Sequence, residues 1–229
     1  MSETAKCRER LKKYIEGYGI DIGYGGDPIV DWAITIDLAE PYIHVGDHAL
    51  NLAGDARNLQ WFRDEVLDFV YSSHLLEDFE DTIGVLHEWL RVLKIGGHLI
   101  LFCPVEQAYR EHCKKTNQPR NRAHKIANFD LYYVKNILDQ IGVTETIRSN
   151  PIIDTYSFEI VAKKVRSMTD KKSRLRYSKA EYDTLLRHLN EKEAAIKFLK
   201  DQKKALLDSN SWKITAPLRK IASMLKKNQ

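Results

Sequence analysis

Gly19-Ile20-Asp21-Ile22-Gly23-Tyr24-Gly25-Gly26 is the stretch of this 229-residue chain that decides its fold. A short apolar run, typical of a buried strand, ends in glycines that let the backbone turn tightly and approach a ligand without a Cβ clash. Such a turn after a strand is a common cradle for nucleotides, although an ordinary tight turn gives the same pattern. The dinucleotide fingerprint would need a third glycine where Pro28 stands. Asp21 also suits a cationic ligand better than a pyrophosphate.

Short apolar runs and helical patterns alternate on both sides of this turn. We expect strands at residues 19–22, 33–38, 67–72, 98–103, 143–148 and 156–163, and helices at 3–16, 81–93 and 129–141. The helix over 81–93 should close on a glycine cap at Gly96-Gly97. This alternation predicts an α/β fold, with a mostly parallel sheet and helices on both faces. Ligands of such sheets bind at the carboxyl ends of the strands.

Three acidic residues lie on successive strand-end loops, at this edge of the sheet. Asp37 ends the second strand, where its carboxylate can accept both hydrogens of a ribose diol. Asp55 lies in Gly54-Asp55-Ala56, where it can accept from an adenine amino group while the next backbone N–H donates to the ring. Each acid alone is typical of a solvated loop. Together with Asp21, they favour a nucleoside-containing ligand.

This ordered set resembles the class I S-adenosylmethionine (SAM)-dependent methyltransferases, in the branch with a methyltransferase type 11 core. The resemblance covers residues 18–138. It rests on Asp21-x-Gly23-x-Gly25, Asp37, Gly54-Asp55-Ala56, Tyr71-Ser72-Ser73-His74-Leu75-Leu76-Glu77 and Leu90-Arg91-Val92-Leu93-Lys94-Ile95-Gly96-Gly97. It implies a Rossmann-like methyltransferase sheet and SAM as the cofactor.

The resemblance also implies a role for each matched residue. The cofactor-binding residues would be Asp21, Gly23, Gly25, Asp37, Asp55, Ala56 and Ser72. Asp21 and the glycines would surround the methionine part, Asp37 would hold the ribose, Asp55 and Ala56 would flank the adenine, and Ser72 would offer its carbonyl to the cofactor's amino group. One departure matters, because only ten residues separate Gly26 from Asp37. The helix after the turn should therefore be short or missing, and the site more open.

The acceptor site is expected in residues 104–128, a long connection of the kind that often forms a lid or binding loop. Methyl transfer is an in-line displacement, so the enzyme positions the acceptor and, for an alcohol, removes its proton. His74 and His124 are the candidate bases; alternatively, His74 packs beside the cofactor and His124 is a surface residue. A set of cations would bind a phosphate or carboxylate, or form only a solvated face: Arg110, Lys114, Lys115, Arg120, Arg122 and Lys125.

The end of the chain differs from the rest in charge and pattern. Residues 167–229 carry 16 Lys/Arg against 7 Asp/Glu, a net charge of +9, which leaves −5 on residues 1–166. The acidic body is a poor nucleic-acid platform, so no nucleic-acid partner is expected. We predict a methyltransferase domain over 1–166, a linker over 167–177, and an amphipathic coiled coil with a basic terminal helix over 178–229.

The tail carries a second resemblance. Ser211-Trp212-Lys213-Ile214-Thr215-Ala216-Pro217-Leu218-Arg219 is similar to a segment that often ends bacterial proteins of surface-polysaccharide synthesis. A coiled coil followed by a basic, Trp-bearing helix suits docking on a polysaccharide-synthesis protein or on an anionic membrane. The alternative is a tail that only makes the enzyme a homo-oligomer.

Other features exclude several classes of protein. No run of 18 apolar residues predicts a transmembrane helix, and the N-terminal residues do not form a secretory signal. Cys7, Cys103 and Cys113 are odd in number and widely spaced, as expected for reduced thiols. No carboxylate or histidine spacing specifies a metal site. We expect a cytoplasmic protein, peripheral at the inner membrane if the tail docks there.

The sequence therefore favours an O-methyltransferase that modifies a sugar of a bacterial surface glycan, such as an O-antigen of lipopolysaccharide (LPS) or a capsule chain. A methyltransferase for a small molecule or a lipid head group would share every cofactor motif. A nucleotide-dependent oxidoreductase would bind NAD instead of SAM. A non-catalytic adaptor that retains the fold would bind no cofactor.

Overall fold

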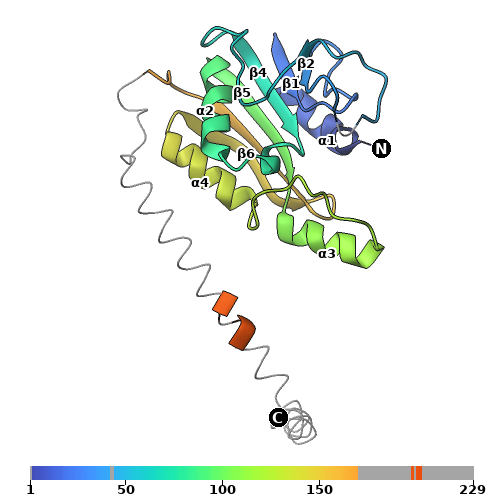
Figure 1. Ribbon diagram of the computed structural model, residues 1–229. Helices are drawn as coiled ribbons and strands as arrows, with labels where there is room; N and C mark the ends of the chain where they lie inside the picture. Colours follow the sequence, from blue (N-terminus) through green and yellow to red (C-terminus); the bar gives the residue numbers. More distant parts are fainter. Residues whose placement is uncertain (1, 42–43, 170–196, 199, 203–229) are drawn as a thin grey trace, which may run out of the picture. The chain divides into compact units, whose positions relative to one another are not determined.

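The computed structural model of the protein describes residues 2–41, 44–169, 197–198 and 200–202 (Figure 1). Its contacts divide the chain into two units, Met1–Arg176 and Tyr177–Gln229, and all the elements below lie in the first. The predicted coiled coil, apart from five helical residues, and the segment 211–219 lie outside the described residues. Within the described ranges, no helix is long and apolar enough to cross a membrane.

Seven strands form one mixed sheet in the order β3-β2-β1-β4-β5-β7-β6. The strands are β1 Gly19–Ile22, β2 Ile34–Asp37, β3 Leu52–Ala53, β4 Leu67–Ser73, β5 Leu93–Pro104, β6 Thr144–Ile153 and β7 Ser157–Lys164. The pairs from β3 to β5 are parallel, and β7 runs antiparallel between β5 and β6. The chain order reverses between β1 and β4, so the crevice for a ligand is expected at their carboxyl ends.

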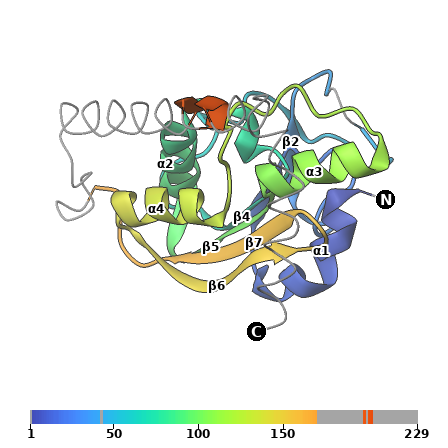
Figure 2. The same ribbon diagram turned by 90° about the horizontal axis from the view of Figure 1, so that it is seen from below.

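Helices cover both faces of the sheet, as predicted (Figure 2). Successive strand side chains point to opposite faces, so one strand feeds two cores. Tyr71 of β4 packs with α1 (Glu3–Leu11), while its neighbour Val70 packs with α2 (Thr82–Val92) and α4 (Leu131–Ile141). A 3₁₀ turn, Lys12–Tyr14, extends α1. The fold is Rossmann-like, with a sheet buried from both sides.

Side-chain caps fix where these helices begin. Asp81 accepts from the Gly84 N–H and caps α2, and Asp130 accepts from the Tyr133 N–H and caps α4. Capping residues lie outside the helix, so both helices start one or two residues later than predicted. The αL conformation of Gly142 ends α4, as its position in the sequence indicates.

Two sequence-based predictions are wrong. Gly96-Gly97 does not cap α2, because β5 already begins at Leu93. Leu67 of β4 pairs with Leu93, but Phe69, two residues later, pairs with His98, five residues later. The extra residues of β5 include the two glycines, which therefore lie in a bulge inside the strand. The connection 104–128 is not all loop, since α3 occupies Glu106–Thr116. This helix buries only Glu106 and Cys113, and it therefore lacks an apolar stripe that a sequence pattern would reveal.

Candidate functional site

The glycine turn leaves β1 at the expected crevice. Gly23, Gly25 and Gly26 have φ angles of +70°, +60° and +87°, a region that side chains disfavour. The Gly23 N–H donates to the Ile36 carbonyl at 2.7 Å and ties the turn to β2. A Cβ on Gly23 would lie 2.7 Å from the Leu75 side chain. The turn therefore needs glycine for its conformation and for its close packing.

No helix connects β1 to β2, which confirms the expectation from the short spacing. Residues 44–48 pack on the turn instead. The Val45 N–H donates to the Gly25 carbonyl at 2.7 Å, the His48 N–H to the Gly26 carbonyl at 3.3 Å, and the Tyr24 hydroxyl to the His48 carbonyl at 2.8 Å. A hydrogen-bonded loop thus takes the place of the helix.

Gly26→Ala is expected to destabilise the fold more than Gly96→Ala in urea unfolding. Both glycines have a positive φ, so each substitution costs roughly 1–3 kcal/mol of backbone strain. A Cβ on Gly26 would also lie 2.7 Å from the Gly46 carbonyl oxygen, whereas nothing lies within 4 Å of one on Gly96. Equal losses of unfolding free energy in the two variants would show that the loop over the turn yields without cost.

Asp37, at the end of β2, lines two adjoining cavities of about 240 and 320 Å³. The two cavities share Gly23, Asp37 and Leu75 in their walls. Asp37 Oδ1 accepts from the Leu38 N–H at 2.8 Å, and Oδ2 accepts from the Gly25 N–H at 3.3 Å. Burial raises the pKa of Asp37, and this effect is larger than the lowering of the pKa by the hydrogen bonds from Leu38 and Gly25. The carboxylate is therefore fixed at the junction of the cavities, with lone pairs left for a ligand.

The larger of these two cavities contains the predicted adenine residues, Asp55 and Ala56. The Ala56 carbonyl accepts from the Trp89 indole at 2.8 Å, which anchors the loop to α2. Arg57 Nε lies 2.9 Å from each of the two carboxylate oxygens of Asp55, and its hydrogen bonds lower the pKa of Asp55. Asp55 is thus ionised and faces the cavity rim, where a ligand amine would share it with Arg57.

The smaller cavity combines the glycine turn with His74 and the first turn of α1. Ser2, Glu3 and Thr4 line it together with Gly23 and Gly25. Ser73 and His74 line it from the end of β4. The Ser73 hydroxyl is buried and has no hydrogen-bond partner among the described residues. Polar groups from three elements therefore converge on one hollow beside Asp37.

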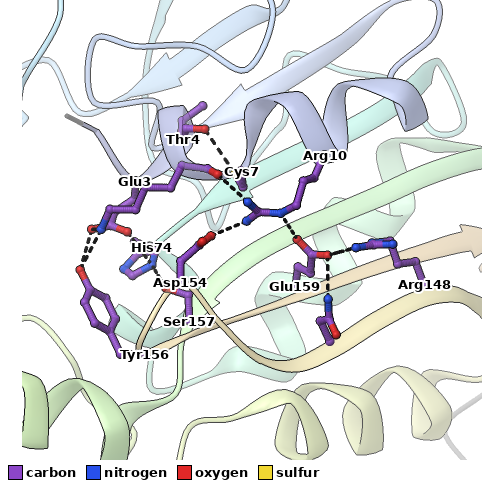
Figure 3. A network of polar contacts seen from close by, with 12 residues as sticks. Glu3, Thr4, Cys7, Arg10, His74, Arg148, Asp154, Tyr156, Ser157 and Glu159 are labelled. Atoms are coloured by element: carbon purple, nitrogen blue, oxygen red, sulfur yellow. Dashed lines mark hydrogen bonds and ion pairs between the residues drawn. The ribbon is translucent and has the colours of Figure 1, made fainter.

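His74 lies at the centre of a polar cluster (Figure 3). Its φ is +51°, and its Nε2 lies 3.1 Å from the Ser157 hydroxyl and 3.4 Å from Glu3 Oε2. Burial lowers the pKa of His74 to about 4 against the raising effect of the Glu3 carboxylate, so the imidazole is neutral at pH 7 and one ring nitrogen has a free lone pair. Glu3 is held in turn by Lys6 at 2.7 Å and by the Tyr156 hydroxyl at 2.8 Å. Burial raises the pKa of Glu3, but His74 and Lys6 outweigh burial and the net shift is downward.

A second cluster fixes α1 on the sheet (Figure 3). Glu159 of β7 is fully buried, and its carboxylate binds Arg10 of α1 and Arg148 of β6. Arg10 also pairs with Asp154. The acid and its arginines hold α1 in position, and they thereby hold Glu3 in the cavity.

Two residues predicted to bind the cofactor lie behind the cavities. Asp21 is fully buried and lines neither of them; its Oδ2 accepts from the Ile29 N–H at 2.7 Å, and burial raises its pKa to about 8. Ser72 is also fully buried, and its hydroxyl donates to the Ile22 carbonyl at 2.9 Å. The side chain of Asp21 therefore holds the backbone after the glycine turn.

His124 is not a surface residue, because its side chain is only 5% exposed. Its Nδ1 lies 2.6 Å from Glu106 Oε2, and its ring packs on Tyr109 at 4.8 Å between centroids. A third cavity, of about 400 Å³, adjoins it. That cavity is lined by Glu106, Arg110, Pro119, Arg120, Asn121, Arg122 and His124. Of the positively charged residues singled out in the sequence, the three arginines line this third cavity, whereas Lys125 lines the cavity of Asp55.

The fold also brings in residues that the sequence does not single out. Glu3 reaches the cavity from α1, far from the glycine turn in the chain, and Glu77 separates the two histidines. His74 Nδ1 lies 3.9 Å, and His124 Nε2 3.6 Å, from Glu77 Oε1. No sequence spacing signals Glu3. Glu77 belongs to the quoted methyltransferase motif, but that motif gives it no role.

Residues 20–101 match a family model described as a methyltransferase domain. The enzyme is a SAM-dependent methyltransferase. A possible histamine N-methyltransferase from Thermotoga maritima has the same fold, with 17% identity, a TM-score of 0.56, and coverage of 71% of this chain and 89% of that one. A putative methyltransferase from Bacillus halodurans is 16% identical, with a TM-score of 0.53, and the match covers 72% of this chain and 100% of that one. The putative methyltransferase of Haloferax volcanii was solved in complex with the Trm112 methyltransferase activator. It is 16% identical, with a TM-score of 0.51, and the match covers 72% of this chain and 90% of that one. No curated protein matched the chain.

The residues of this methyltransferase fit SAM. Asp37 stands at the junction of two cavities, so one group can accept from the middle of an elongated ligand that fills both. Glycine at position 23 leaves the common wall clear, and the unpartnered Ser73 hydroxyl faces the smaller cavity. An elongated ligand with an aromatic heterocycle, a diol and a charged amino acid end matches the surfaces of the two cavities in this order.

Proposed function

We propose that the methyltransferase transfers a methyl group to a hydroxyl of a sugar in a bacterial surface polysaccharide, such as an O-antigen or a capsule chain. The observation that carries the proposal is His74, which lines the same cavity as Gly23, Gly25 and Asp37. A neutral, buried imidazole beside the cofactor turn is what an alcohol acceptor requires, because its proton must leave as the C–O bond forms.

The cofactor roles proposed here follow the geometry of the two cavities. Asp37 accepts from the ribose hydroxyls, Asp55 and Ala56 flank the adenine, and the turn at Gly23–Gly25 surrounds the methionine end. Asp37 is already oriented by two backbone N–H groups, so it loses little freedom on binding. Asp21 and Ser72 support the turn from behind instead of contacting the ligand through their side chains.

SAM supplies the methyl group as part of a sulfonium, which makes proton removal from the acceptor the main chemical task of the protein. We propose that His74 Nε2 takes this proton. Glu3 Oε2, 3.4 Å away, stabilises the imidazolium that forms, while the Ser157 hydroxyl, at 3.1 Å, orients the ring.

The cavity of Arg110, Arg120 and Arg122 supports an anionic acceptor. Arginine binds carboxylate and phosphate through paired N–H donors, and such groups occur in uronic acids and in phosphate-linked glycans. Residues 211–219, which lie outside the described residues, support the polysaccharide assignment through their resemblance alone. Contact of the tail with a membrane, with a synthesis protein or with a second copy remains part of the same proposal.

An assay of labelled methyl transfer tests the proposal. Acidic and neutral surface glycans, lipid-linked oligosaccharides, a lipid head group and a small amine are compared as acceptors with SAM. We expect transfer to a glycan hydroxyl, and the product should resist the mild hydrolysis that removes methyl esters. Transfer to the amine or the head group alone, or to none of the acceptors, would contradict the proposal.

In the same assay, the double variant Arg120→Gln and Arg122→Gln should raise the KM for an acidic glycan at least about tenfold, the loss of one or more charge-assisted hydrogen bonds. The control is Lys114→Gln with Lys115→Gln, which removes the same charge from exposed positions of α3 that do not line the cavity. Equal KM values for the two double variants would rule out recognition by the arginines.

A further inference from the structure

Glu77, Asp78 and His124 form a cluster that neither the cofactor nor the acceptor assignment uses. Glu77 and Asp78 belong to a 3₁₀ turn after β4, Leu76–Asp78, and His124 lies in the segment between α3 and α4. One ligand atom from each lies within 4.8 Å of the others. We propose that these three residues bind a divalent metal cation close to His74.

Glu77 is the strongest argument for a bound cation. Its side chain is fully buried, and neither carboxylate oxygen has a hydrogen-bond partner in the described part of the chain. A buried carboxylate without a hydrogen-bond donor is costly, and proteins pair such groups or bind metal with them. Two imidazole nitrogens lie within 4 Å of Glu77 Oε1, and neither is close enough to donate a hydrogen bond to it: His124 Nε2 is 3.6 Å away and His74 Nδ1 is 3.9 Å away.

His124 is oriented as a metal ligand. Its Nδ1 lies 2.6 Å from Glu106 Oε2, so this nitrogen carries the proton and donates it. Nε2 is then the nitrogen with the free lone pair, and it points at Glu77 Oε1 from 3.6 Å. A lone pair that faces a carboxylate at this distance needs a positive centre between them. A carboxylate on the second nitrogen is also the usual support of a metal-bound histidine.

The place of the cluster links it to the active site. Asp78 lines the cavity of Asp55 and Ala56, and His124 lines the cavity of the arginines, so a cation can enter from solvent on either side. His74 Nδ1 is 3.9 Å from Glu77 Oε1, which places the site behind the proposed base. Two carboxylates and one imidazole suit Mn²⁺ or Zn²⁺ better than a soft, thiolate-seeking ion.

The sequence hides this site. Glu77 and Asp78 are adjacent, but His124 is 46 positions beyond Asp78, and α3 and its flanking loops separate them. The rival explanation is a proton in place of the metal, shared by Glu77 and His124. Burial raises the pKa of Glu77 well above its ordinary value, which favours that proton when no cation is present.

Metal binding to the full-length chain distinguishes these explanations. Protein stripped with a chelator is titrated with Mn²⁺, followed by electron paramagnetic resonance of the free ion, and with Co²⁺, followed by visible absorption. We expect one equivalent of each cation to bind. Glu77→Gln, which keeps the shape and removes the charge, should weaken binding at least about 100-fold, and Glu106→Gln, which leaves the ligands in place, about 10- to 100-fold.

Glu111→Gln is the matched control, because Glu111 is an exposed acid on the same helix as Glu106. It should bind both cations as the wild type does. His124→Ala provides a second test if Glu77→Gln fails to fold, and it should change the Co²⁺ spectrum by removing the nitrogen ligand. Wild-type protein that binds neither cation, or Glu77→Gln protein that binds them equally well, would overturn the proposal in favour of the shared proton.

Discussion

Asp37→Ala protein is expected to bind SAM about 100-fold more weakly than the wild type, measured by isothermal titration. A half-buried carboxylate that accepts from both ribose hydroxyls contributes charge-assisted hydrogen bonds of about 1.5–3 kcal/mol each, and 2.7 kcal/mol is roughly a factor of 100 in affinity. The substitution also frees the Gly25 N–H from its acceptor, which loosens the turn in the same direction. Folding should survive, because Asp37 lies at the end of β2 and is not part of either core.

Two further variants sharpen this test. Asp37→Asn keeps one acceptor oxygen for one of the two backbone N–H groups and loses the charge, so its affinity for SAM should fall between those of the wild type and Asp37→Ala. Asp31→Ala removes an exposed acid just before β2 that lines neither cavity, and it should bind SAM normally. SAM affinity that is unchanged in Asp37→Ala would refute the ribose assignment.

His74→Gln should lower kcat by a factor of about 10²–10⁴, the usual contribution of a general base. Glutamine can still hydrogen-bond to Ser157, but it cannot take a proton from the acceptor. Affinity for SAM should change little, because the cofactor contacts proposed here come from the glycine turn, Asp37 and the Asp55 loop. The measurement is kcat in the glycan assay beside a SAM titration of the same protein.

His87→Gln is the control for that experiment. His87 lies on α2 and lines none of the three cavities, and its substitution likewise replaces an imidazole by an amide. Its kcat should match that of the wild type. If His74→Gln also retains the wild-type kcat, His74 is a packing residue beside the cofactor, and the acceptor needs no base from this position.

The sequence predicted the central strands well because their signal is local. β1 has the predicted bounds, since four consecutive buried residues end in glycines. α2 was recognisable from its apolar stripe, and α4 from its helical pattern and the glycine that follows it; the aspartates that cap both helices were not recognised as such. By contrast, α3 buries too little to produce a stripe, and the antiparallel direction of β7 depends on pairings that no single segment encodes.

The candidate site was predictable only in part. Asp37, Asp55 and the glycines stand at strand ends, so the sheet topology alone brings them together. The side chain of Asp21 has the same sequence signal but is fully buried, and a strand pattern alone did not reveal that. Glu3 and Glu77 take their places through the docking of α1 and through the segment that carries His124. These contacts are long-range, and chain spacing therefore carries no trace of them.

The position of α1 has a consequence for dynamics. Ser2, Glu3 and Thr4 form one wall of the His74 cavity, and α1 is anchored there by the pairs from Arg8 to Asp27 and from Arg10 to Glu159. Local unfolding of α1 would remove this wall while leaving the sheet intact, because the elements of a domain open with different free energies. The amide-exchange protection of α1 therefore measures how large a fraction of the enzyme has a complete His74 cavity at any moment.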